Sequence, residues 1–148
     1  MRYIPVLTKA VAIILFGTAL MKVLDSVSRA DYFDQADSVF FFLTNRQMMI
    51  VAAALEIGVA VYILFAPSIK FRGLALLWLC ALFILYKIGL DKTFATKPCS
   101  CLGILARWFK LSNHQLGIIT WLLLAIMIAI AIIMLLSSHL ENKQKFRK

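Results

Sequence analysis

Four long apolar stretches constrain this chain more than any other feature of its sequence. They cover residues 4–21, 48–66, 73–90 and 116–136, and each contains at least 18 residues. A helix that crosses a bilayer needs about 20 mostly apolar residues, whereas strands rarely exceed about 8. Backbone inside lipid must satisfy its own hydrogen bonds, and the alternating pattern of a membrane barrel is absent. The sequence therefore predicts an all-α, integral membrane four-helix bundle that forms a single domain over residues 1–148.

Composition and charge exclude an ordinary soluble domain. Hydrophobic residues make up 63% of the chain and charged residues 16%, whereas globular domains are about 45–50% apolar and about 25% charged. The formal net charge of +9 could suggest nucleic acid, but a nucleic-acid-binding protein gathers its positive charge on one face or stripe. Here the basic residues fall in the gaps between the apolar stretches. We therefore expect a lipid bilayer as the first partner and no nucleic acid.

The distribution of lysine and arginine predicts that both termini face the cytoplasm. Basic residues are dense in the short turn 67–72 and in the tail 139–148, and five of the seven acids lie in the longer segments 25–47 and 91–115. Short basic segments favour the cytoplasmic side, so the two longer segments are the expected outer loops. The first span is expected to be retained, because no A-x-A cleavage site follows it. The apolar patch 39–43 would either lie on the membrane or cap the bundle.

Two closely spaced cysteines, Cys99 and Cys101, stand in the second outer loop within residues 97–103 (KPCSCLG). A disulfide between them would close a very small ring, and departures from relaxed bridge geometry store strain. Strained disulfides are more oxidising, and a cross-link over so short a loop stabilises little. Lys97 would favour the reactive thiolate form of the neighbouring cysteine. The pair is therefore a candidate catalytic site for thiol–disulfide exchange.

Other interpretations of the cysteines stay open. The pair could be an inert or purely structural disulfide, because its expected position faces the oxidising side of the membrane, where disulfides persist. A zinc site would need four ligands, usually at wider spacing, and only His114 is near, so we predict no metal. Cys80 falls in the middle of the third span, where a thiol acts as a small apolar side chain.

Ionisable residues inside the spans form a second candidate site. Such groups are costly in a bilayer, usually face the bundle interior and mark functional sites. Glu56 lies at the centre of the second span and Lys87 about 7.5 Å beyond the centre of the third, which predicts a Glu56–Lys87 pair. Lys22, at the outer end of the first span, would instead extend to the headgroups. These groups, with Lys97, would move protons or stabilise a thiolate or quinone oxygen; alternatively, the pair only fixes the register of the helices.

Several of these residues together resemble the MauE branch of the DoxX-like membrane proteins, named for methylamine utilisation. The resemblance covers roughly residues 4–136 and rests on Gly17, Lys22 and Asp25, on Glu56, and on the C-S-C-L-G element at 99–103. It implies a bacterial inner (plasma) membrane protein concerned with thiol–disulfide chemistry outside the membrane. MauE-type proteins are linked to maturation of a disulfide-rich dehydrogenase subunit, and DoxX relatives to thiosulfate or sulfide oxidation. By position, Cys99 and Cys101 would be the redox pair.

The leading hypothesis is therefore an inner-membrane redox protein that uses its C-x-C pair to assist oxidation or maturation of an exported or membrane partner. Membrane enzymes that generate disulfides generally need a second cysteine pair, and this chain has only Cys80 to spare. Another protein or a quinone would then take the electrons, although no cofactor is required by the sequence. Three tryptophans, Trp78, Trp108 and Trp121, would line a quinone site or serve in packing and at the interface. The alternative is a non-catalytic membrane anchor or assembly subunit of a larger oxidoreductase or transport complex.

Overall fold

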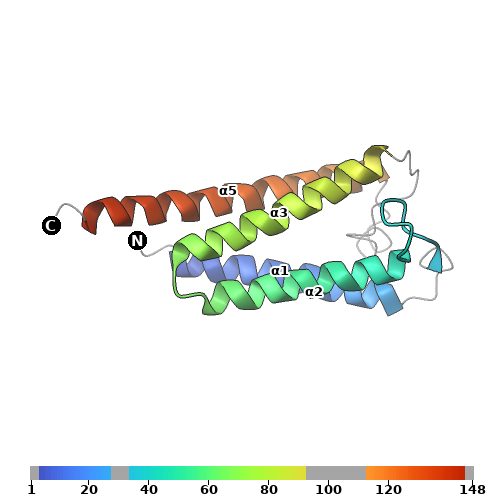
Figure 1. The fold of residues 1–148 in the computed structure, drawn as a ribbon, viewed down its shortest axis with the longest axis horizontal. Coiled ribbons are helices and arrows are strands. Elements are labelled where there is room, and N and C mark those ends of the chain that lie inside the picture. Colours follow the sequence, from blue (N-terminus) through green and yellow to red (C-terminus); the bar gives the residue numbers. More distant parts are fainter. Residues whose placement is uncertain (1–3, 28–33, 93–112, 146–148) are drawn as a thin grey trace.

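The computed structural model describes residues 4–27, 34–92 and 113–145, and these form four helices (Figure 1). The helices are α1 (Ile4–Val27), α2 (Asn45–Phe65), α3 (Ile69–Lys92) and α5 (Asn113–Lys145). Each contains a segment long and apolar enough to cross a membrane. The predicted fold class is confirmed: the chain is an all-α, multi-pass membrane protein.

The helices pack as two pairs, α1 with α2 and α3 with α5. The pairs meet where a short turn at residues 66–68 joins α2 to α3, and from there α2 and α3 diverge toward the opposite end (Figure 1). We call that opposite end, where α1 and α3 end and α2 and α5 begin, the loop end. Cavities lie between the pairs, and the charged residues Lys22, Glu56 and Lys87 line the smallest of them.

The helices are longer than the apolar stretches that predicted them. The expected turn 67–72 shrinks to residues 66–68, and α5 continues through most of the expected tail, to Lys145. An apolar stretch marks the part of a helix that lies in lipid, whereas backbone hydrogen bonding continues through good helix formers such as lysine and glutamate. The basic tail predicted from residue 139 is therefore helical as far as Lys145.

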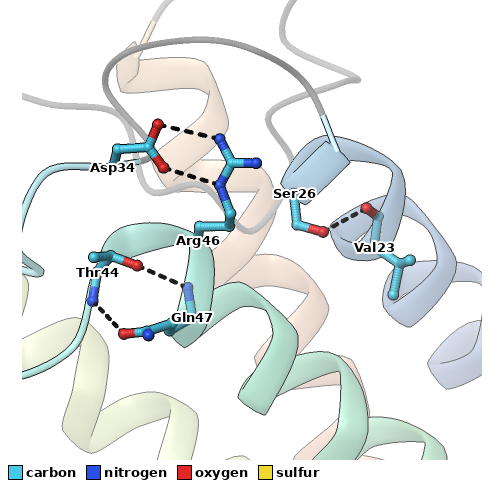
Figure 2. A network of polar contacts seen from close by, with 6 residues as sticks. All are labelled: Val23, Ser26, Asp34, Thr44, Arg46 and Gln47. Atoms are coloured by element: carbon cyan, nitrogen blue, oxygen red, sulfur yellow. Dashed lines mark hydrogen bonds and ion pairs between the residues drawn. The ribbon is translucent and has the colours of Figure 1, made fainter.

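A capping box sets the start of α2. The Thr44 side chain accepts a hydrogen bond from the Gln47 backbone N–H (3.2 Å), and the Gln47 side chain accepts one from the Thr44 N–H (2.9 Å; Figure 2). These bonds satisfy donors that a helix start leaves unpaired. Beside them, Arg46 and Asp34 form an exposed ion pair with a shortest distance of 3.1 Å. The Thr-x-x-Gln signature was visible in the sequence and could have placed the start of this helix at Asn45.

Small and medium apolar side chains fill the centre of the bundle. Helices in lipid pack by close contact of their surfaces, which small residues permit. Cys80 is 2% exposed within this core, as expected for a small apolar side chain. Larger side chains such as Phe65 and Leu85 face outward, where lipid covers them. The central cluster consists of Val11, Ala12, Leu15, Val59, Ala60, Ile63, Leu76, Leu79, Cys80, Leu124, Met127 and Ala131.

Gly73 allows the close approach of α3 to α5. A Cβ atom at this position would lie 3.1 Å from Cγ of Leu135 and 3.2 Å from the carbonyl oxygen of Ala131. We expect Gly73→Val to lower the free energy of unfolding by about 1–3 kcal/mol, because the backbone must shift to admit the side chain. Gly58→Val is the matched control, since no heavy atom apart from those of its chain neighbours and of its own helix backbone lies within 4 Å of its Cβ position. Unfolding in mixed micelles measures both variants, and equal losses would contradict the tight contact.

Candidate functional site

A buried ion pair joins α1 to α2 in the interior of the bundle. Nζ of Lys22 lies 2.6 Å from Oε1 of Glu56, and the two side chains are only 5% and 4% exposed. The Lys22 ammonium also lies 5.5 Å from the centre of the Phe83 ring on α3. An ion pair removed from water persists only when its geometry is good, because both charges lose their hydration. Charges held at this depth of a membrane protein mark a candidate functional site.

Two predictions about these charged residues are wrong. Glu56 pairs with Lys22 rather than with Lys87, and Lys22 is buried rather than extended to the headgroups. The physical reason is the arrangement of the helices: α1 and α2 pack against each other, whereas α2 and α3 diverge toward the loop end (Figure 1). Spacing in the sequence estimates the depth of a residue in the membrane but not which helices are neighbours.

Lys87 is nevertheless part of the same interior. It is 7% exposed, and its Nζ lies 5.7 Å from the centre of the Trp121 ring on α5. A cation over an aromatic face is stabilised by the ring quadrupole, more strongly when water is excluded. Trp121 thus has a packing role toward this lysine, while Trp78 is 54% exposed on the outside of α3.

One small cavity brings the three charged residues together. This inner cavity has a volume of about 60 Å³ and is lined by residues from all four helices. That volume admits a few water molecules or a small polar group. Its polar lining consists of Thr18, Lys22, Glu56, Cys80, Tyr86, Lys87 and Thr120.

The inner cavity contains polar atoms whose hydrogen-bonding capacity is not used within the described part of the chain. Oε2 of Glu56 is buried and has no hydrogen-bond partner there. An ammonium group has three N–H donors, and Lys22 donates one of them to Glu56. The Lys87 ammonium lies over the face of Trp121 and forms no hydrogen bond or ion pair with another described residue. Because buried polar groups in native proteins are almost always satisfied, water or a ligand is expected to complete this site.

A larger outer cavity lies between α2, α3 and the patch 39–43. Its volume is about 450 Å³, and it shares Lys22, Phe83 and Tyr86 with the inner cavity. Apart from Lys22, Asn45 and Tyr86, its lining consists of Val39, Phe40, Phe42, Leu43, Met48, Met49, Val51, Ala52, Leu55, Leu82, Phe83 and Leu85. The outer cavity is therefore an apolar space with a buried cation at its inner wall.

Asp37 holds a cap over the outer cavity. It is 1% exposed, and its Oδ1 accepts hydrogen bonds from the backbone N–H groups of Val39 (2.8 Å) and Phe40 (2.9 Å). The hydroxyl of Tyr86 on α3 donates to the other carboxylate oxygen at 2.6 Å. A carboxylate that accepts three hydrogen bonds is a strong anchor, because charge-assisted bonds are about twice as strong as neutral ones. Residues 34–44 are accordingly fixed to α3, and we call them the cap segment.

The apolar patch of the cap segment divides into two parts. Phe40 stacks on Tyr86 with ring centres 6.3 Å apart, and Val39 lies against Gly89, where a Cβ would be 3.1 Å from the valine methyl groups. Phe41 and Phe42 are each 79% exposed at the loop end. Val39 and Phe40 thus pack over the end of α3, as in one of the two predicted roles of the patch, whereas the exposed Phe41 and Phe42 fit the other. Sequence reasoning did not find Asp37, whose signal was a single acid just before an apolar run.

The predicted thiol site is not among these residues. Cys99, Cys101 and Lys97 lie in 93–112, outside the described residues. His114 is exposed near the start of α5, and the described residues contain no group of three histidine, cysteine or acidic residues that could hold a metal ion. The structure therefore locates the polar interior site, while the C-x-C pair stays a prediction.

The family resemblance of the sequence also stays a prediction. It rests on the residues named for it, of which Lys22, Asp25 and Glu56 are all buried. Their positions agree with an interior polar site but do not by themselves identify a family. Comparison with known proteins found no match to a family model, to a curated protein or to a solved structure.

Proposed function

We propose that this chain is a thiol–disulfide redox protein of the bacterial inner membrane, with both termini in the cytoplasm. In this proposal Cys99 and Cys101 exchange a disulfide with an exported partner and so assist its oxidation or maturation. The observation that carries the proposal is the spacing of the two cysteines, one residue apart in a segment between two spanning helices. A bridge across so small a ring is strained, and strained disulfides are the reactive ones.

The exchange transfers two electrons and two protons. A thiolate of the partner attacks one sulfur of the Cys99–Cys101 disulfide, forms a mixed disulfide and releases the other sulfur as a thiolate. The partner's second thiolate then attacks the mixed disulfide, so that the partner leaves oxidised and both cysteines are reduced. A membrane quinone or another disulfide protein must then take the two electrons, because the chain has only Cys80 besides this pair.

Two features of the described residues support the proposal. The segment that contains the cysteines follows the end of α3 and precedes the start of α5, and both of these helix ends lie at the loop end, as the cap segment does (Figure 1). The interior site near that end contains a carboxylate and two ammonium groups in one cavity. Thiol oxidation releases protons, and a buried Glu56 with an oxygen free of described partners can hold one.

Thiol trapping tests the proposed function. Membranes are treated with a membrane-impermeant maleimide before and after reduction, and we expect Cys99 and Cys101 to react from the outer side only after reduction. In Cys101→Ser, the Cys99 thiolate can attack the disulfide of the oxidised partner and release one partner thiolate, but no Cys101 thiol remains to take part in the exchange, so the mixed disulfide should accumulate. Cys80→Ala, which removes the buried cysteine, should behave as wild type.

Two results would contradict the proposal. One is a cysteine pair that never changes its redox state, together with normal partner oxidation in Cys99→Ser. The other is reaction of the pair from the cytoplasmic side. A stoichiometric partner that still co-purifies with an active Cys99→Ser/Cys101→Ser variant would indicate the non-catalytic anchor or assembly subunit instead.

A further inference from the structure

The outer cavity has the access, the walls and the hydrogen-bond donor of a site for a lipophilic molecule with a planar, uncharged head. We propose that it binds the head of an isoprenoid quinone, with one quinone oxygen accepting a hydrogen bond from Lys22. Quinone binding depends only on the described residues, whereas the redox role of the quinone rests on the proposed function.

Access to the outer cavity is from the lipid. Two of its lining residues, Val51 on α2 and Leu85 on α3, are 44% and 66% exposed within the membrane-spanning parts of these helices. Because these exposed lining residues belong to α2 and α3, the cavity is reached from the lipid between these two helices. A ligand that is dissolved in the bilayer can enter by this route, and its apolar chain can remain in the lipid.

The walls of the cavity suit a flat ring. Four aromatic residues line it, Phe40, Phe42, Phe83 and Tyr86, together with aliphatic side chains and two methionines. Aromatic faces favour stacking with planar rings, and ligand sites of about 300–1,000 Å³ are typically apolar with a few placed polar groups. The volume of about 450 Å³ falls in that range.

Lys22 determines which kind of ligand head group fits the outer cavity. Its ammonium lines both cavities and is buried, and two of its three N–H donors have no acceptor among the described residues. Its charge is already balanced by Glu56 at 2.6 Å. Lys22 is the one charged residue among the described residues that line the outer cavity, and Glu56 balances its charge, so this cavity offers hydrogen-bond donors with little net charge. That combination favours a neutral carbonyl oxygen over a carboxylate or a phosphate.

A bound quinone would supply the electron acceptor that the proposed function requires. Two thiols and one quinone give one disulfide and one quinol, so that two electrons and two protons pass to the quinone. Glu56 lies next to the proposed donor, and its second oxygen lines the interior without a described partner. It is placed to pass a proton to a reduced quinone oxygen by way of Lys22 or water.

Binding is measured by titrating the full chain in lipid nanodiscs with a short-chain ubiquinone, with empty nanodiscs as the blank. We expect saturable binding of one quinone per chain. Ala52→Trp, which places a large side chain in the outer cavity, should weaken binding at least tenfold. Ala54→Trp is the matched control, because Ala54 is exposed on the same helix and does not line the cavity, and it should bind as wild type.

A second variant keeps the test independent of cavity filling. Lys22→Met/Glu56→Gln removes the donor without leaving a lone buried charge, and it should also weaken binding at least tenfold. Wild-type affinity in Ala52→Trp, or equal displacement of the quinone by decanoic acid, would overturn the proposal, the latter by showing an unspecific lipid groove. Cys99→Ser/Cys101→Ser should still bind quinone, so loss of thiol exchange and loss of quinone binding are separate outcomes.

Discussion

Lys22→Met is expected to lower the free energy of unfolding by about 3–5 kcal/mol. The substitution leaves the Glu56 carboxylate 3% exposed in the bundle, without the ammonium that lies 2.6 Å from one of its oxygens. Removing one partner of a buried pair is costly because the remaining charge is neither hydrated nor compensated. Reversible unfolding in mixed micelles at constant lipid composition measures the change.

The double variant Lys22→Met/Glu56→Gln separates the buried charge from the loss of packing. A neutral amide in place of the carboxylate removes the uncompensated charge, so most of the lost stability should return. Lys9→Met, at an exposed position of the same helix, should change stability by less than about 0.5 kcal/mol. A double variant as unstable as Lys22→Met would contradict the dominant role of the ion pair.

Asp37→Ala is the second substitution for which we expect a large effect, a loss of about 2–4 kcal/mol. It removes the acceptor of the Tyr86 hydroxyl and of two backbone N–H groups, all of them within 2.9 Å of the carboxylate. Because Asp37 is buried, these donors would be left without their partner. The loss should also release the cap segment from α3, which limited proteolysis within residues 34–44 would detect.

Asp34→Ala is the matched control for the cap. Asp34 belongs to the same segment and also forms an ion pair, but its side chain is 70% exposed. Exposed ion pairs contribute about 0–1 kcal/mol, since water and salt screen them. Equal losses in the two variants would show that the cap segment is not held by the buried carboxylate.

The arrangement of these groups explains how a small bundle can keep charges inside a membrane. The ion pair lies between the closely packed α1 and α2, and the divergence of α2 from α3 leaves the two cavities next to it. The cap segment then covers the outer cavity at the loop end, held there by the hydrogen bond that the Tyr86 hydroxyl donates to Asp37. The described residues thus combine a buried ion pair, an apolar cavity beside it and a cap segment over that cavity.

The sequence by itself determined the number of spanning helices and the interior positions of Glu56 and Lys87, but not the burial of Lys22 or Asp37. The lipid core selects helices by length and hydropathy, which are properties of each segment taken alone. For that reason, hydropathy along the chain predicts the four spans, the burial of Cys80 and the interior position of Glu56. The chemistry that we propose for the C-x-C pair also rests on the sequence alone, namely on the size of the ring that a bridge would close.

Only the tertiary structure decided which groups meet. Glu56 pairs with Lys22 and not with Lys87, because α1 is the close neighbour of α2 while α3 diverges from it. The cap through Asp37 joins residues 49 positions apart, and the cavities exist only between helices. In a bundle whose helices are apolar on all sides, hydropathy does not specify which faces are in contact. Packing of side chains makes that choice, and it is not encoded in any one segment.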